Sequence, residues 1–121
     1  MKKILVIEDV DFNRDLLMQL LEDDFELVSA KDGASGIEMA AREKPDLILM
    51  DLSLPVVDGW EATRRLKSNS ELKAIPIVAL TAHAMRGDEA KARAIGCDGF
   101  LTKPIDEDLL FRTLRQFLGE R

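Results

Sequence analysis

Leu47–Ile48–Leu49–Met50–Asp51 is the stretch of sequence that decides the fold of this chain. Its four consecutive apolar residues predict a strand that is buried on both faces of a sheet. A helix could carry the same run, but Pro45 before it and Pro55 after it leave too little room for one. The run ends in the carboxylate of Asp51, and a charge at the mouth of a buried strand is unfavourable unless another group compensates it. A lone aspartate there would ordinarily be a helix cap or a turn residue. The residues at the other strand ends must therefore show whether Asp51 belongs to a functional site.

The composition is that of a globular protein, and we expect one domain over residues 1–121. The chain is 46% hydrophobic and 33% charged, and its net charge of −6 provides no excess of cations for nucleic acid. Cys97, the single cysteine, permits no internal disulfide bond and suggests a reducing compartment. No apolar run approaches the roughly 20 residues of a membrane span, and the one near the start is too short for a signal peptide. We therefore expect a cytoplasmic protein that binds neither nucleic acid nor a membrane directly.

Strand and helix patterns alternate along the whole chain. Besides the stretch above, strands are predicted over residues 4–7, 26–30, 77–81 and 100–102. Helices are predicted over about residues 11–23, 33–44, 58–68, 88–95 and 106–118, with Asp32 as a cap. The residues expected on the apolar faces of the first two helices are Phe12, Leu16, Leu17, Leu20 and Leu21, and then Ile37, Ala40 and Ala41. This alternation indicates a parallel sheet with helices on both faces, an α/β fold.

The first and third strands are the most apolar, so we expect them at the centre of the sheet. With right-handed crossovers, this favours the strand order 2-1-3-4-5, whose switch point lies between strands 1 and 3. Ligands in such sheets bind at the carboxyl ends of the strands beside that point. The residues at those ends are therefore the candidates for a functional site.

The predicted strand ends carry three carboxylates, a hydroxyl and an ammonium group, from Glu8, Asp9, Asp51, Thr81 and Lys103. Two carboxylates about 5 Å apart repel each other by roughly 3 kcal/mol at an effective dielectric constant near 20. Three carboxylates in one place would destabilise the fold, so their presence together is not explained by a structural role. A bound hard divalent cation would offset their repulsion and does explain it. Oxygen ligands at strand ends suit Mg²⁺, which keeps several of its waters.

A magnesium site of this kind leaves positions open for phosphate oxygens, and a carboxylate can act as a nucleophile that forms an aspartyl phosphate. Phosphoryl transfer then requires mainly positioning and neutralisation of the equatorial oxygens, which Lys103 and the Thr81 hydroxyl could assist. Taken singly, Thr81 would more often be a cap and Lys103 a surface ion pair. Their coincidence on successive strand ends favours the phosphoryl site.

The chain resembles, over its whole length, the receiver domain of two-component response regulators. The matching segments are residues 7–9, 45–51, 54–55 with 58–59, 79–82 and 100–104. The resemblance implies a flavodoxin-like, doubly wound (βα)₅ fold with Asp51 as the phosphoacceptor. It also implies that Asp9, Asp51 and the backbone carbonyl of Ser53 ligate Mg²⁺, and that Glu8 acts through a water.

The resemblance further assigns contacts with the phosphoryl group to Thr81 and Lys103, and a cis peptide bond to Lys103–Pro104. It implies a switch in which Thr81 moves toward the phosphoryl group and an aromatic side chain, here Phe100, turns inward behind it. Many relatives have tyrosine at this position, and phenylalanine lacks the hydroxyl that a buried tyrosine uses to bind backbone. A role for Phe100 as ordinary core therefore stays open.

Ser53 and His83 fall where members of the family vary to set the lifetime of the phosphoryl group. His83 is the only histidine. It could also be a catalytic base or a metal ligand, but we favour a loop residue that tunes the access of water. Trp60, the only tryptophan, follows Gly59 near the site, where we expect it to pack a helix.

The function that we expect is a phosphoacceptor switch. It would take its phosphoryl group from a phosphohistidine on a histidine kinase or phosphotransfer protein, hydrolyse it slowly and bind a downstream protein target. It would be an enzyme only in that limited sense. The kinase side is expected on the first helix and its preceding loop, and the output side on the fourth helix, fifth strand and fifth helix. We favour a stand-alone, single-domain receiver, with a receiver from a larger regulator or hybrid kinase as the alternative. A monomer and a weak dimer both stay open.

Three other functions fit the sequence less well. An aspartyl-phosphate phosphohydrolase needs a second acid two residues after its nucleophile, and Ser53 stands there. A nucleotide or flavin module needs a loop rich in glycine, serine or threonine after the first strand, where residues 8–11 read Glu-Asp-Val-Asp and would repel phosphate. An adaptor that works without phosphorylation is disfavoured, but not excluded, by the intact set of five residues at the strand ends.

Overall fold

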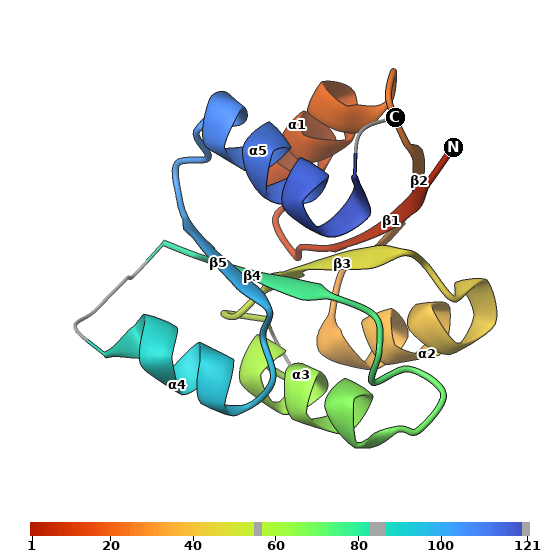
Figure 1. The fold of residues 1–121 in the computed structure, drawn as a ribbon, viewed down its shortest axis with the longest axis vertical. Coiled ribbons are helices and arrows are strands. Elements are labelled where there is room, and N and C mark those ends of the chain that lie inside the picture. Colours follow the sequence, from red (N-terminus) through yellow and green to blue (C-terminus); the bar gives the residue numbers. More distant parts are fainter. Residues whose placement is uncertain (55–56, 83–86, 120–121) are drawn as a thin grey trace.

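The computed structural model describes residues 1–54, 57–82 and 87–119, and its centre is a five-stranded sheet (Figure 1). The strands are β1 (Lys3–Ile7), β2 (Glu26–Ala30), β3 (Leu47–Asp51), β4 (Ile77–Thr81) and β5 (Gly99–Thr102). Every neighbouring pair is parallel, and the order is β2-β1-β3-β4-β5. The predicted fold class and strand order are confirmed.

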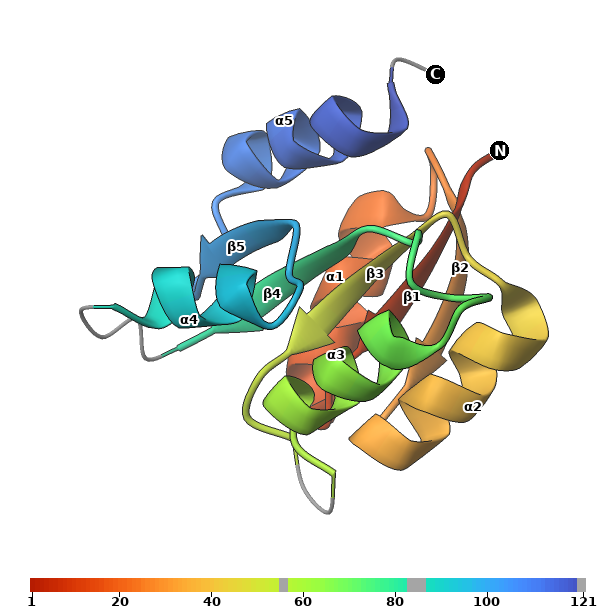
Figure 2. The ribbon, with the colours of Figure 1, turned by 60° about the horizontal axis from the view of Figure 1, so that its bottom comes forward.

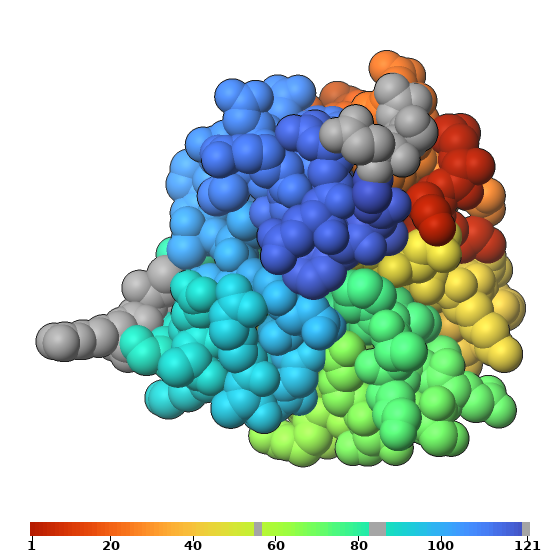
Figure 3. Space-filling view, viewed as in Figure 1, coloured from red at the N-terminus to blue at the C-terminus, as the bar shows by residue number. Residues whose placement is uncertain are grey.

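In the described part of the chain, five helices cover the two faces of the sheet (Figures 1 and 2). They are α1 (Asp11–Leu21), α2 (Gly33–Glu43), α3 (Gly59–Ser68), α4 (Asp88–Ala94) and α5 (Glu107–Leu118). Buried residues of α1 and α5 share one core cluster, and those of α2, α3 and α4 share the other. On the face seen in the space-filling view, α5, α4 and α3 form a continuous surface (Figure 3). None of the helices in the described ranges has the length and apolar character that a bilayer crossing requires.

The central strands and the helix starts follow from local sequence. The apolar residues of β1 and β3 are fully buried, as expected for continuous apolar runs at the centre of a parallel sheet. Asp32, Asp58 and Asp106 cap α2, α3 and α5 by accepting a backbone N–H three residues ahead, at 2.7, 2.9 and 3.1 Å. Such caps satisfy amide groups that the first helical turn leaves unpaired.

The predicted apolar faces of α1 and α2 are partly wrong. Phe12 is 74% exposed and Leu16 is 45% exposed, whereas Leu17 and Leu21 are buried. The sheet covers only the strip of α1 that carries Leu17 and Leu21, so the flank with Phe12 and Leu16 faces outward. On α2, Ala40 is buried but the next residue, Ala41, is exposed because it lies about 100° further around the helix.

The backbone of Gly59 lies directly against the end of β3. A Cβ atom at this position would be 2.2 Å from the carbonyl oxygen of Asp51 and 2.4 Å from the Cα of Leu52. The Gly59 amide also donates to the Leu52 carbonyl at 3.1 Å. A residue without a side chain therefore allows α3 to begin beside the strand end that carries Asp51.

We predict that Gly59→Ala lowers the free energy of unfolding by about 1–3 kcal/mol, because the added methyl group has no room. The sign of this change tests the contact, because alanine in place of glycine in a helix otherwise raises the free energy of unfolding by about 1 kcal/mol. Urea unfolding followed by circular dichroism measures the change. An increase in stability would show that the contact with the β3 backbone is not restrictive.

Candidate functional site

Three acidic residues meet where β1 and β3 end. Ile7 pairs with Met50 in the register of these two strands, so the residues that follow, Glu8 and Asp51, lie side by side. Glu8, Asp9 and Asp51 each offer one carboxylate oxygen, and these oxygens lie within 4.8 Å of one another. The structure thus brings together the three carboxylates that the sequence places at the switch point.

Lys103 compensates part of this negative charge. Glu8 is fully buried and Asp51 is only 3% exposed, so both carboxylates are largely removed from water. The Lys103 ammonium nitrogen lies 2.5 Å from Glu8 Oε1 and 3.6 Å from Asp51 Oδ2. The backbone amide of Lys103 donates to the Thr81 carbonyl at 2.8 Å, which holds the residue at the same edge of the sheet.

Backbone amides bind the remaining oxygens of the two buried carboxylates. Ser53 N–H donates to Asp51 Oδ1 at 3.0 Å, and Val10 N–H donates to Glu8 Oε2 at 3.3 Å. The Asp51 carboxylate therefore has one oxygen held by the loop after β3 and the other turned toward Lys103. No buried side-chain nitrogen or oxygen lacks a partner in the described ranges.

The surroundings of Glu8 change its acidity. Burial and the neighbouring Asp51 carboxylate raise the pKa of Glu8 to about 7, against the opposing effect of Lys103. A buried carboxyl group next to a second carboxylate keeps its proton because ionisation would add a charge that little solvent can stabilise. At neutral pH, this site is therefore poised between a protonated and a fully charged form.

The acidic cluster fits a magnesium ion. Mg²⁺ binds oxygen ligands at about 2 Å, so two direct ligands of one ion lie at most about 4 Å apart. Oxygens within 4.8 Å of one another can reach this geometry by a small adjustment or through a bridging water. The donors are all carboxylate oxygens, which Mg²⁺ prefers to nitrogen or sulfur.

The other predicted site residues lie around this cluster. Thr81 is buried at the end of β4, and Phe100 on β5 packs half-buried against the core cluster of α2, α3 and α4. Ser53 is exposed in the loop after β3. The Lys103–Pro104 peptide bond is cis, the form that the resemblance implies. His83 lies outside the described residues.

Sequence reasoning did not single out Arg14, although its side chain reaches the backbone of this site. Its guanidinium donates to the carbonyl oxygen of Glu8 at 2.9 Å. A signal was available in the sequence, because a cation near the amino end of a helix opposes the helix dipole and requires an explanation.

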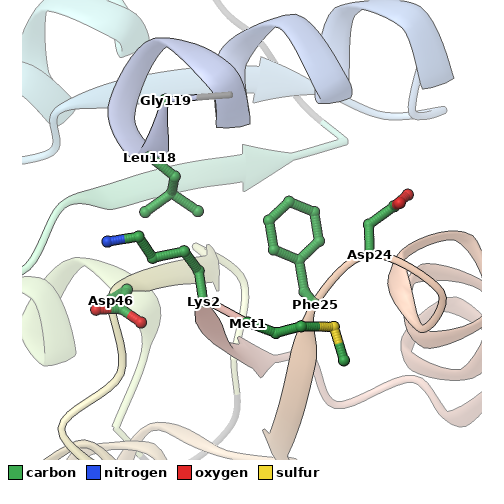
Figure 4. A pocket seen from close by; sticks show the side chains of 7 residues that line it. All are labelled: Met1, Lys2, Asp24, Phe25, Asp46, Leu118 and Gly119. Carbon is green, nitrogen blue, oxygen red and sulfur yellow. The ribbon is translucent and has the colours of Figure 1, made fainter. Parts of the chain in front are cut away.

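A hollow in the described part of the chain lies away from the acidic cluster. It has a volume of about 640 Å³ and lies around Phe25 and the residues just before β1, β2 and β3 (Figure 4). Its lining residues are Met1, Lys2, Asp24, Phe25, Asp46, Leu118 and Gly119. In sheets of this type ligands bind at the opposite, carboxyl ends of the strands, where Glu8 and Asp51 lie.

Comparison with known proteins gives a consistent result. Residues 4–115 match the family model of the response regulator receiver domain. The chain is 38% identical over 120 residues to the polar-differentiation response regulator DivK of Brucella anthropi, with 98% of each chain covered.

Solved structures with the same fold include two that bear on the site. One is the receiver domain of the sensor histidine kinase PA1611 from Pseudomonas aeruginosa PAO1, with a magnesium ion in its active site cleft; its TM-score is 0.90, with 33% identity and 98% of both chains covered. The other is a chain in the co-crystal structure of the Saccharomyces cerevisiae histidine phosphotransfer protein Ypd1 with the receiver domain of Ssk1. Its TM-score is 0.88 at 28% identity, with 96% of this chain and 88% of that chain covered.

We predict that the metal-free protein loses stability between about pH 5 and pH 8 through the ionisation of Glu8. The pKa of Glu8 is about 7 in the folded protein against an ordinary value of 4.5, so the folded state binds more protons than the unfolded state in this interval. The free energy of unfolding then falls with rising pH, by about 3 kcal/mol for this group. Urea unfolding in the presence of a chelator measures the profile.

Glu8→Gln serves as the control, because glutamine does not ionise and its profile should lack this component. Asp32 and Glu43 have lowered pKa values, so their effects fall below this interval. Parallel profiles for the wild type and Glu8→Gln would contradict the prediction.

We predict that Asp51→Asn stabilises the metal-free protein at pH 8 by about 1–3 kcal/mol, because it removes the repulsion between Asp51 and its two acidic neighbours. Unfolding midpoints with a chelator present measure the gain. Glu38→Gln removes the same charge from an exposed position on α2 and should change little. An unchanged or lower midpoint for Asp51→Asn would show that the carboxylates do not destabilise one another.

Proposed function

Because this chain belongs to the family of response regulator receiver domains, we propose that it is a phosphoacceptor switch in which Asp51 receives a phosphoryl group. One observation carries the proposal: three carboxylate oxygens converge at the switch point of the sheet with Lys103 beside two of them. Such crowding of charge, with the Glu8 and Asp51 carboxylates buried, opposes folding and is explained by a cation and an anionic ligand that bind there in turn.

In the proposed reaction Asp51 is the nucleophile. Its Oδ1 accepts a hydrogen bond from Ser53 N–H, so Oδ2, on the side of Lys103, is the oxygen that attacks phosphorus. A P–O bond to Asp51 forms while the P–N bond of the donor phosphohistidine breaks, and the imidazole leaves. Lys103 and the Thr81 hydroxyl then contact phosphoryl oxygens. Slow attack by water on phosphorus breaks the P–O bond to Asp51, releases inorganic phosphate and returns the free carboxylate.

The carboxylates of Asp9 and Asp51 and the backbone carbonyl of Ser53 would hold Mg²⁺, with Glu8 acting through a water. When bound, Mg²⁺ supplies positive charge that offsets both the carboxylates and the incoming phosphoryl oxygens. Lys103 already occupies the space between Glu8 and Asp51 and is placed to shift toward the phosphoryl group.

The response to phosphorylation would pass through Thr81 and Phe100. Thr81 ends β4 and Phe100 lies on the neighbouring strand β5, where it is paired with Ala79. Movement of Thr81 toward the phosphoryl group would leave space into which the half-buried Phe100 ring turns. Since Phe100 has no hydroxyl, packing alone would set the preference between its two positions. A downstream protein would read this change on α4, β5 and α5.

An apolar surface beside the site suits a protein donor. Phe12 and Leu16 are exposed on α1, and with Pro104 and Ile105 they line a hollow of about 210 Å³ that also includes Glu8 and Lys103. The Saccharomyces cerevisiae co-crystal structure pairs a receiver domain with a histidine phosphotransfer protein. By analogy, a kinase or phosphotransfer protein would cover Phe12 and Leu16 and present its phosphohistidine to Asp51.

We predict that incubation with acetyl phosphate and Mg²⁺ adds one phosphoryl group to the chain, because the small donor needs only the nucleophile and the cation. Intact mass spectrometry detects the adduct. Asp51→Asn and a sample with a chelator should gain no mass. Phosphorylation of Asp51→Asn at the rate of the wild type would overturn the proposal.

Phe12→Asp is a matched control for the donor surface. It alters the exposed flank of α1 and leaves the acidic cluster in place, so acetyl phosphate should still phosphorylate it. Loss of phosphorylation by acetyl phosphate in this variant would contradict the assignment of Phe12 to the docking surface, because it would show that Phe12 is needed for the reaction itself.

A further inference from the structure

Arg14 clamps the backbone that joins the two acidic residues after β1. One guanidinium nitrogen donates to the Glu8 carbonyl oxygen at 2.9 Å, and another binds the Asp11 carboxylate. The Arg14 side chain is only 18% exposed, whereas that of Asp11 is 84% exposed. A largely buried cation near the amino end of α1 is unfavourable for both solvation and the helix dipole, so its hydrogen bonds must provide the compensation.

The carbonyl that Arg14 binds belongs to the peptide group between Glu8 and Asp9. The Glu8 amide, on the other side of the residue, donates to the Ala30 carbonyl at 3.1 Å. Glu8 is therefore held at its N–H by β2 and at its C=O by α1. Since a peptide group is planar and rigid, fixing its carbonyl also fixes the direction in which the Asp9 side chain leaves the backbone.

We propose that Arg14 is a positioning residue for the metal site, which orients the Glu8–Asp9 peptide so that both carboxylates converge with Asp51. The inference rests on the proposed function for the identity of the ion. The fork of the guanidinium group is essential, because it holds the Glu8 carbonyl and the Asp11 carboxylate at once. A lysine would keep the charge but would not bridge the same two groups in a fixed plane.

The charge of Arg14 and its positioning role have opposite effects on the affinity of the site for Mg²⁺, which makes the proposal testable. A cation this close to a binding site for Mg²⁺ repels the ion, so removing its charge should by itself tighten binding. Positioning predicts the reverse, because outer-shell hydrogen bonds that orient metal ligands typically contribute 10-fold or more to affinity. The sign of the change in affinity therefore separates the two effects.

The test is a titration with MgCl₂, followed by the amide resonances of ¹⁵N-labelled protein. Arg14→Met keeps the aliphatic stem and the helix propensity of the residue. We expect its dissociation constant for Mg²⁺ to be about 10-fold higher than that of the wild type, with a smaller increase for Arg14→Lys. Arg42→Met, which removes an exposed arginine from α2, should match the wild type.

A second readout uses the metal-free protein and separates positioning from a general loss of structure. Arg14→Met should shift the ¹⁵N resonance of Asp9, whose amide shares the peptide group that loses its hydrogen bond. Resonances of β4 and β5 should stay in place, which also verifies that the variant is folded.

Unchanged or tighter binding of Mg²⁺ by Arg14→Met would overturn the positioning role alone. If the wild type gave no Mg²⁺ response, or if Asp9→Asn bound Mg²⁺ as the wild type does, the assignment of the metal site would fail and the positioning role with it.

Discussion

The repulsion between Glu8 and Asp51 is the interaction on which the rest of the site depends. Both carboxylates are buried where two central strands end, and the Lys103 ammonium group is the cation that the structure places against them. Burial of the Glu8 carboxyl group and the neighbouring Asp51 carboxylate together raise the pKa of Glu8 to about 7, against the opposing effect of Lys103. At neutral pH the metal-free site is therefore poised between binding a proton on Glu8 and carrying the full negative charge that a metal ion would offset.

The fold imposes this arrangement through register and close approach. Pairing of Ile7 with Met50 makes Glu8 and Asp51 neighbours, and the bond from Lys103 N–H to the Thr81 carbonyl brings the end of β5 to the same edge. The absence of a side chain at Gly59 lets α3 start against the Asp51 backbone. Each of these is a constraint on the backbone, so the site is positioned by the same contacts that stabilise the sheet.

Most of the fold could be predicted because its signals are local and repeated. Continuous apolar runs identify β1 and β3 as central, and the alternation of strands with helices leaves few strand orders. The strand ends could be predicted as a cluster because parallel strands share one carboxyl edge. What the sequence does not encode locally is how much of a helix the sheet covers. This is why the expected apolar stripe of α1 includes the exposed Phe12 and Leu16, and why the burial expected for Ala41 is wrong. The sequence does place Arg14 where its charge opposes the helix dipole, but which group its side chain binds is evident only from the structure.

The exposed flank of α1, which carries Phe12 and Leu16, lies next to the charged groups of the site. Leu17 and Leu21 attach the helix to the sheet, Arg14 ties its first residues to the acidic loop, and Phe12 and Leu16 remain exposed. The hollow that Phe12 and Leu16 line also contains Glu8 and Lys103, so a protein that covers the apolar flank also excludes water from the charged groups. Exclusion of water strengthens the attraction of Lys103 for a phosphoryl group. Under the proposed function, docking of a protein donor on α1 would therefore promote the reaction at Asp51, while a small donor would react in a site that is more open to water.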